Sequence, residues 1–155
     1  MAVRLGARSN PQDTVEQVGE RNFRLAGDYV AFERFDAGQG GADYNVEVVN
    51  LRTRRRLHHV PTGPIPSDAN FAGGFSGGSS GTGPTTALVL NPHGSVAWIV
   101  RDVYAAGRSY QVHKDDHAGP ALLDEGSAID PRALTAAGGV VSWIDAGQRR
   151  TAPLS

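Results

Sequence analysis

A three-residue pattern occurs three times along this chain and constrains its fold more than any other feature. The pattern is a valine, a small residue and an aromatic residue, found as Val30-Ala31-Phe32, Val96-Ala97-Trp98 and Val141-Ser142-Trp143. Each copy stands two or three residues after a glycine, and each glycine follows a leucine, at Leu25, Leu90 or Leu134. Two apolar runs separated by turn residues predict a β-hairpin. The chain is therefore expected to repeat one β unit.

The segments around these patterns have the composition of short β-strands. They are rich in β-branched and aromatic residues and are bounded by turn formers, at 29–35, 45–49, 87–90, 96–100, 109–113 and 140–144. A third strand is expected in each unit at 44–50, 109–114 and 148–154, and a fourth at 56–61 and 120–124. No window keeps apolar residues at helical spacing for three turns. The sequence predicts an all-β fold of about three four-stranded antiparallel β-meander units.

The spacing of the copies divides the chain into units within a single domain. The valines at 30, 96 and 141 are 66 and 45 residues apart, and a Gly-rich insertion at 63–84 accounts for the longer interval. We expect units at 23–61 and 85–127, a partial unit at 130–155, and a loop at 63–84. Residues 1–20 are expected to hold strands of a preceding unit.

One meander unit cannot bury both faces of its sheet, which gives a physical reason for the repetition. Neighbouring units in a stack cover each other with side chains of their second strands. Trp98, Trp143 and Phe32 are therefore expected in the contacts between units.

The pattern Leu-x-x-Gly-x-Val-Ala-Trp, followed by a strand such as Val-Glu-Val-Val-Asn-Leu-Arg-Thr at 46–53, resembles a known kind of repeat. It is similar to the blades of bacterial β-propeller-like proteins of the TolB-type and tryptophan-aspartate-repeat (WD-like) groups. Residues 134–154 look like the closing blade of actinobacterial proteins of this type. The resemblance implies an incomplete or open propeller acting as a non-catalytic binding or scaffold module, with a protein or carbohydrate partner.

A closed propeller needs at least four blades, so three units raise the question of closure. Three alternatives follow: the chain is the C-terminal part of a longer propeller whose N-terminal blades are missing, it closes by homo-oligomerisation, or it packs as an open sandwich. The first alternative is preferred here.

Composition excludes several classes of partner. The 15 basic and 16 acidic residues nearly cancel, so we expect neither nucleic acid nor a membrane surface as partner. With no cysteine the chain has no disulfide and no thiolate ligand. No signal segment and no apolar run of about 18 residues occurs, which predicts a soluble chain, or a secreted one if it belongs to a longer precursor.

The strongest candidate for site chemistry is the run His113-Lys-Asp-Asp-His117. Imidazole and carboxylate groups bind zinc and other divalent ions, so His113, Asp115 and His117 are the candidate metal ligands. A metal site here would make the chain a small metal-dependent hydrolase or lyase, which is the alternative function. The preferred interpretation is a solvated hairpin turn, with no catalytic residue and no cofactor.

Two other segments are candidate binding surfaces. Arg54, Arg55 and Arg56 form the main run of positive charge, which we expect in an exposed hairpin that could meet an acidic partner. Phe71 and Phe75 lie in the Gly-rich insertion, where they could hold the loop or contact a ligand.

Overall fold

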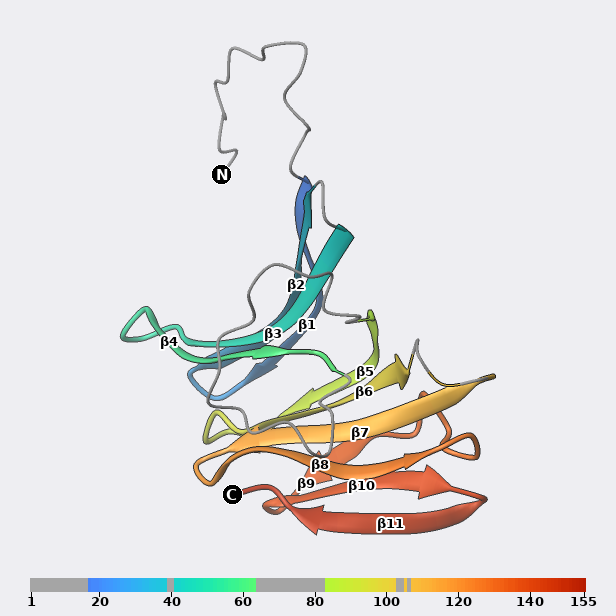
Figure 1. Ribbon diagram of the computed structural model, residues 1–155. Coiled ribbons are helices and arrows are strands. Elements are labelled where there is room, and N and C mark those ends of the chain that lie inside the picture. The colour runs from blue at the N-terminus through green and yellow to red at the C-terminus, as the bar shows by residue number, and fades with distance from the viewer. Residues whose placement is uncertain (1–16, 39–40, 64–82, 103–104, 106) are drawn as a thin grey trace.

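The structure is a computed structural model that describes residues 17–38, 41–63, 83–102, 105 and 107–155. These residues form strands and turns and contain no helix, which confirms the all-β prediction. No helix in this part of the chain could therefore cross a membrane. The strands form three separate antiparallel sheets, which we name A, B and C in chain order, and none of them closes into a barrel (Figure 1).

Each sheet is a meander in which strands that follow one another in sequence pair side by side. Sheet A contains β1 (Gln17–Ala26), β2 (Tyr29–Gly38), β3 (Gly41–Asn50) and β4 (Arg55–Pro61). Sheet B contains β5 (Thr85–Leu90), β6 (Val96–Asp102), β7 (Ser109–Asp116) and β8 (Gly119–Gly126). Sheet C contains β9 (Thr135–Ala137), β10 (Val140–Asp145) and β11 (Gln148–Pro153).

The structure corrects the sequence prediction in one detail. Residues 17–20, expected in a preceding unit, belong to β1 and pair with residues 34–37 of β2. Sheet C has three strands, where the sequence predicted a third strand and no fourth, and the Leu154 N–H extends the β10–β11 pairing by donating to the Gly139 carbonyl. Residues 1–16, with the other expected strand of that unit, and residues 64–82 of the Gly-rich insertion lie outside the described residues.

The repeated pattern gives each sheet two distinct faces. Successive side chains of a strand point to opposite faces, so we call the face with the valine and the aromatic residue the front and the face with the middle residue the back. In β6, Val96 and Trp98 point from the front toward sheet A, whereas Ala97 and Ile99 point from the back toward sheet C. Sheet B is thus buried on both faces.

Two hydrophobic cores hold the stack together. The front of sheet B packs on the back of sheet A through Ala31, Val46, Val48, Val60, Leu88, Val96, Trp98 and Val100. The front of sheet C packs on the back of sheet B through Ala97, Ile99, Tyr110, Val112, Ile129, Leu134, Val141, Trp143 and Leu154. Trp98 and Trp143 are buried as expected, and each fully buried large apolar side chain contributes roughly 1.5–3 kcal/mol.

Phe32 has a different environment from the two tryptophans. It lies on the front of sheet A, is only partly buried, and stacks on Phe23 with ring centroids 5.5 Å apart. No described strand covers this face, so the expected contact between units is present for Trp98 and Trp143 and not for Phe32.

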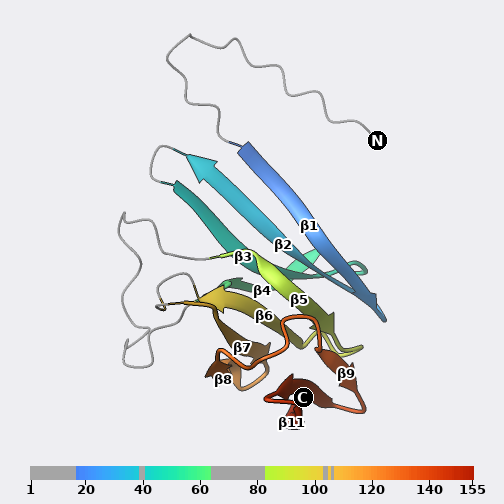
Figure 2. The same cartoon turned by 90° about the vertical axis from the view of Figure 1, so that its right-hand side faces the viewer.

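The first strands of the three sheets approach each other most closely. Among strands of different sheets, the closest backbone approaches join β5 to β1 and β2 on one side and to β9 on the other. Figure 2 shows β1, β5 and β9 along one side of the stack. The sheets are therefore arranged around their first strands.

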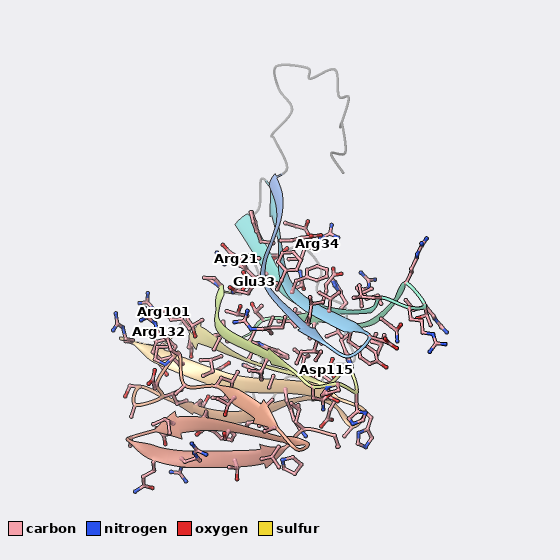
Figure 3. The ribbon with its side chains drawn as sticks, turned by 180° about the vertical axis from the view of Figure 1, so that it is seen from behind. Arg21, Glu33, Arg34, Arg101, Asp115 and Arg132 are labelled. Carbon is pink, nitrogen blue, oxygen red and sulfur yellow. The ribbon has the colours of Figure 1, made fainter. Side chains whose placement is uncertain are left out.

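A polar contact reinforces the junction between sheets A and B. The fully buried carboxylate of Glu33 accepts hydrogen bonds from Arg21 Nε and from both the N–H and the hydroxyl of Thr85 (Figure 3). Asn22 Nδ2 donates to the same Thr85 hydroxyl at 2.8 Å. A buried charge is tolerated only when paired and hydrogen-bonded, as this one is.

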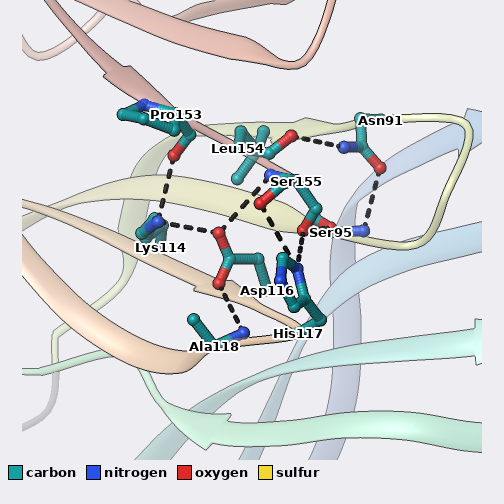
Figure 4. Close-up of polar contacts among 9 residues, drawn as sticks. All are labelled: Asn91, Ser95, Lys114, Asp116, His117, Ala118, Pro153, Leu154 and Ser155. Atoms are coloured by element: carbon teal, nitrogen blue, oxygen red, sulfur yellow. Dashed lines mark hydrogen bonds and ion pairs between the residues drawn. The ribbon is translucent and has the colours of Figure 1, made fainter.

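A second polar network fixes the end of β11 against sheet B (Figure 4). Asn91 Nδ2 donates to the Leu154 carbonyl at 2.9 Å, and Ser95 Oγ donates to the Ser155 carbonyl at 2.7 Å. Lys114 Nζ donates hydrogen bonds to the Asp116 carboxylate at 2.7 Å and to the Pro153 carbonyl at 3.0 Å. The closing strand of sheet C is thereby attached to the turns of sheet B.

Candidate binding site at one end of the sheets

The two ends of the stack differ in the chain segments they expose. At one end, the hairpin end, short turns at 27–28, 51–54, 91–95, 117–118 and 138–139 join consecutive strands of a sheet. At the other, the connection end, lie the described connecting residues 62–63, 83–84, 105, 107–108, 127–134 and 146–147. Irregular connections held on a rigid sheet scaffold are common places for binding residues.

A polar pocket of about 620 Å³ opens at the connection end between sheets B and C. It is lined by Thr86, Arg108, Tyr110, Asp130, Pro131 and Arg132. These residues come from the start of β5, the β6–β7 connection, the start of β7 and the β8–β9 connection. The pocket thus exists only because sheets B and C are packed together.

The Asp130-Pro131-Arg132 turn fixes one wall of the pocket. Asp130 Oδ1 accepts a hydrogen bond from the Arg132 N–H at 3.0 Å, a local bond typical of aspartate in turns. The Asp130 N–H donates to the Ile144 carbonyl of β10 at 2.9 Å, and the neighbouring Ile129 forms a bridge with Asp145. The turn is therefore attached to sheet C, which holds the Arg132 backbone at the rim.

Three arginines lie at this end of the molecule and form no ion pair with any residue that the structure describes. Arg108 and Arg132 line the pocket, and Arg101 is the cross-strand neighbour of Tyr110 on the same face of sheet B. All three are exposed, and none forms an ion pair within the described part of the chain. Figure 3 shows Arg101 and Arg132 at the same end of the stack. The lining of the pocket consequently carries two guanidinium groups and one carboxylate, although the whole chain is nearly neutral.

Hydroxyl groups complete the lining of the pocket. The Thr86 hydroxyl donates to the Ile99 carbonyl at 3.2 Å, which leaves its oxygen able to accept. Tyr110 is 7% exposed and lines the pocket, and its hydroxyl has no hydrogen-bond partner in the described residues. The pocket therefore combines guanidinium groups, hydroxyls and one carboxylate, all of which can bind a polar ligand.

A second cavity, of about 500 Å³, lies between sheets B and C at the hairpin end and is mainly apolar. Its main polar side chain, Asn91, is already engaged: Nδ2 donates to Leu154, while Oδ1 accepts from the N–H groups of His93 and Ser95. We assign this cavity a structural role.

The structure does not bring the candidate metal ligands together. Asp115 points from the front of sheet B and accepts a hydrogen bond from His58 Nδ1 at 2.7 Å. His117 lies in the β7–β8 turn and contacts the Ser155 carbonyl through Nδ1 at 3.0 Å. No group of three His, Cys, Asp or Glu side chains in the described residues is arranged to hold a metal ion. The geometry gives the metal hypothesis no support.

His113 itself is a core residue. It is fully buried on the front of sheet B, and its Nε2 contacts Gln111 Oε1 at 2.9 Å. Its Nδ1 is buried without a hydrogen-bond partner in the described structure. Because burial disfavours the charged ring, the pKa of His113 is lowered to about 4, and the ring is neutral near pH 7.

Asp116, between the candidate ligands, belongs to the network at the end of β11. Burial alone raises the pKa of its carboxyl, but hydrogen bonds from Lys114 Nζ and from the N–H groups of Ala118 and Ser155 outweigh that effect. Its pKa is therefore below its usual value, and the carboxylate serves to hold the β7–β8 turn and the chain end.

The expected arginine surface lies far from the pocket. Arg54 is in the β3–β4 turn at the hairpin end, with a φ of 58°, and Arg55 and Arg56 begin β4. All three are exposed, and Arg56 lies 3.7 Å from the Glu47 carboxylate. Phe71 and Phe75 fall outside the described residues.

Sequence reasoning missed the residues of the connection-end pocket. Arg101, Arg108 and Arg132 are separated along the chain and form no charge run. The one signal available was the Asp-Pro pair at 130–131, which favours a turn. That signal locates a turn but does not indicate which other residues lie beside it.

Comparison with protein-family models, with curated proteins and with solved structures finds no match to this chain. Its function is therefore argued from the geometry of the site.

Proposed function

We propose that this chain is a non-catalytic binding module, built from propeller-like blades of the bacterial TolB-type or WD-like kind, that binds an acidic carbohydrate at its connection end. The observation that carries the proposal is the pocket between sheets B and C, where Arg108, Arg132 and the Tyr110 hydroxyl lack protein partners in the described residues.

The arrangement of the sheets supports a propeller-like architecture. Each unit is a meander, the aromatic front of one sheet packs on the small-residue back of the sheet before it, and the first strands lie closest together. Blades of a propeller are four-stranded sheets placed around a central axis, with their first strands innermost.

The chemistry of the pocket favours a sugar acid. Guanidinium groups bind carboxylates through paired, charge-assisted hydrogen bonds, so Arg108 and Arg132 suit the acid group. The Asp130 carboxylate would repel a second acid group but accepts hydrogen bonds from sugar hydroxyls, and Tyr110 and Thr86 can do the same. A ligand with one acid group and several hydroxyls satisfies all of these groups, whereas an acidic peptide leaves Asp130 without a role.

A binding role fits the pocket better than catalysis. Glycoside hydrolysis normally uses two carboxyl groups placed across one bond, and Asp130 is the carboxylate that lines this pocket. The alternative of a metal-dependent hydrolase or lyase would need His113, Asp115 and His117 to converge, and they contact three different partners.

The proposal is tested by calorimetric titration with a short galactose oligosaccharide that carries a single galacturonic acid residue, with the fully neutral galactose oligosaccharide for comparison. We expect binding of the acidic sugar only, with an affinity that falls as salt increases, because screening weakens exposed charge pairs. Arg132→Ala and Arg108→Ala should each weaken binding by about tenfold, the effect of removing a charged hydrogen bond. Arg52→Ala, at an exposed arginine in the β3–β4 turn of the hairpin end, is the matched control and should have no effect.

Equal binding of the neutral sugar would show that the arginines do not recognise an acid group. If instead a glutamate-rich peptide binds and loses affinity in the same two variants, the partner is an acidic protein. Both results would overturn the assignment of an acidic carbohydrate.

A further inference from the structure

The front of sheet A carries a row of apolar side chains on β1 and β2 with no described strand opposite it, beside the ionic cluster of Glu47 on β3. Phe23 is 52% exposed and Leu25 is 73% exposed, and they lie beside Val30 and Phe32 of the neighbouring strand. Scattered exposed apolar residues are ordinary on protein surfaces, but a contiguous row on one sheet face indicates an interaction surface.

The two interfaces between sheets inside the chain show which surface packs against an aromatic front face. The front of sheet B, with Val96 and Trp98, packs on a back face that carries Ala31. The front of sheet C, with Val141 and Trp143, packs on a back face that carries Ala97. In both interfaces an aromatic front meets the back of a meander sheet, where the middle residue of the pattern is small. The front of sheet A, with Val30 and Phe32, is the third copy of the same surface.

The back of sheet C is likewise not covered by any described strand. Ser142 occupies there the position that Ala31 and Ala97 occupy in the other two sheets. Its neighbours on this face include Thr151 and Thr135, and the Thr135 and Ser142 hydroxyls are 2.8 Å apart. Small side chains at these positions leave room for an aromatic ring, as the alanines do in sheets A and B.

We infer that two copies of this chain associate head to tail, with the front of sheet A of each copy on the back of sheet C of the other. The contact continues the interfaces already present between sheets A, B and C. Two copies of three sheets give a ring of six, within the range of about four to eight blades of closed propellers. A head-to-tail contact that closes in this way forms a finite ring and leaves no further face exposed.

The area available is sufficient for a stable dimer. Sheet C limits each contact, because its longer strands have six residues: about six residues at ~3.3 Å per residue, three strands abreast at ~4.8 Å, give a face on the order of 300 Å². A ring buries four such faces, on the order of 1,200 Å² in total, which lies at the lower end of the size range of stable protein interfaces. Because both contacts form together in the ring, neither copy keeps a free face that could bind a third copy.

The test uses light scattering and analytical ultracentrifugation of the full chain and of variants at exposed positions. Leu25→Glu blocks the front of sheet A, and Thr151→Glu blocks the back of sheet C. Leu51→Glu, at a leucine that is also half exposed but lies in the β3–β4 turn, is the matched control. We expect a dimer for the full chain and for Leu51→Glu, and a loss of dimer affinity of about tenfold or more in each blocked variant.

Mixing the two blocked variants provides the decisive measurement. The intact front of the Thr151→Glu chain can bind the intact back of the Leu25→Glu chain. The mixture should therefore form more one-to-one dimer, through this single contact, than either variant forms alone at the same total concentration. This recovery also shows that both variants are folded. A monomeric full chain, open-ended growth with concentration, or a Thr151→Glu variant that remains as dimeric as the full chain would each overturn the proposal.

Discussion

His113 of β7 lies nearly flat against Trp98 of β6, with ring centroids 5.4 Å apart and ring planes inclined by 12°. The pair occupies the contact between sheets A and B, where Trp98 Nε1 also donates to the Thr62 carbonyl of sheet A at 2.7 Å. A titratable ring is thus part of the core that joins the two sheets, and its charge state affects their packing.

The stability of the protein is expected to fall in mild acid because of His113. Its pKa is about 4 in the folded protein and near 6.5 in the unfolded chain, so the unfolded chain binds more protons between these values. The stabilising effect of the neutral ring is complete above about pH 6.5 and is lost as the pH falls toward 4. A difference of about 2.5 pKa units sets an upper limit of ~3 kcal/mol. Urea unfolding at a series of pH values between 4 and 7 measures this change.

The substitution His113→Phe separates this effect from general acid denaturation. It keeps a flat ring against Trp98 and removes the titrating group, so we expect a flatter dependence of unfolding free energy on pH. His93→Gln, at an exposed histidine in the β5–β6 turn, is the control and should retain the wild-type slope. An unchanged slope in His113→Phe would assign the acid sensitivity to other groups.

The buried carboxylate of Glu33 is expected to be important for stability. Glu33→Ala leaves Arg21 and the Thr85 N–H without their acceptor and opens a cavity between sheets A and B. Breaking one side of a buried, hydrogen-bonded pair typically costs about 3–5 kcal/mol. Chemical denaturation should show this loss, whereas Asp36→Ala, which removes an exposed partner of Arg34, should cost less than about 1 kcal/mol. A similar effect of the two changes would contradict a structural role for Glu33.

Gly63 is expected to tolerate no side chain. It has a φ of 119°, and a Cβ there would lie 3.0 Å from His113 Nε2 and 3.3 Å from Val100 Cγ1. Gly107 has a similar φ of 105° and open space at the Cβ position, so Gly107→Ala carries the backbone strain alone. We expect Gly63→Ala to be more destabilising than Gly107→Ala by about 1–3 kcal/mol, the cost of overpacking, as measured by thermal and urea unfolding. Equal losses in the two variants would mean that the segment at Gly63 moves away from His113 without cost.

The sequence predicted the strands of this protein well because their signals are local. Alternating apolar residues between turn formers marked β2, β6, β7 and β10, and the repeated pattern marked which strand of each unit is the second. The start of β1 was harder to predict from the sequence. Its polar residues give a weak alternating pattern, and a bulge shifts the register between Arg21 and Arg24.

The candidate site was far less predictable. His113 and Asp115 both lie on the front of sheet B, but His113 contacts Gln111 and Asp115 contacts His58. His117 lies in the β7–β8 turn and contacts Ser155, so the three side chains do not converge. The arginines of the connection-end pocket are distant in sequence and become neighbours only through the packing of sheets B and C. Both the separation of the candidate metal ligands and the formation of the arginine pocket depend on the order and orientation of the sheets, which the sequence does not state.

The sequence by itself determined the all-β class, the meander units and the burial of Trp98 and Trp143 between sheets, because these depend on turn chemistry and on a period of two. The tertiary structure decided which face of each sheet is covered, that His113 is a neutral core residue, and that Arg108, Tyr110 and Arg132 share a pocket. These properties depend on contacts between separate sheets, which no local pattern along the chain specifies.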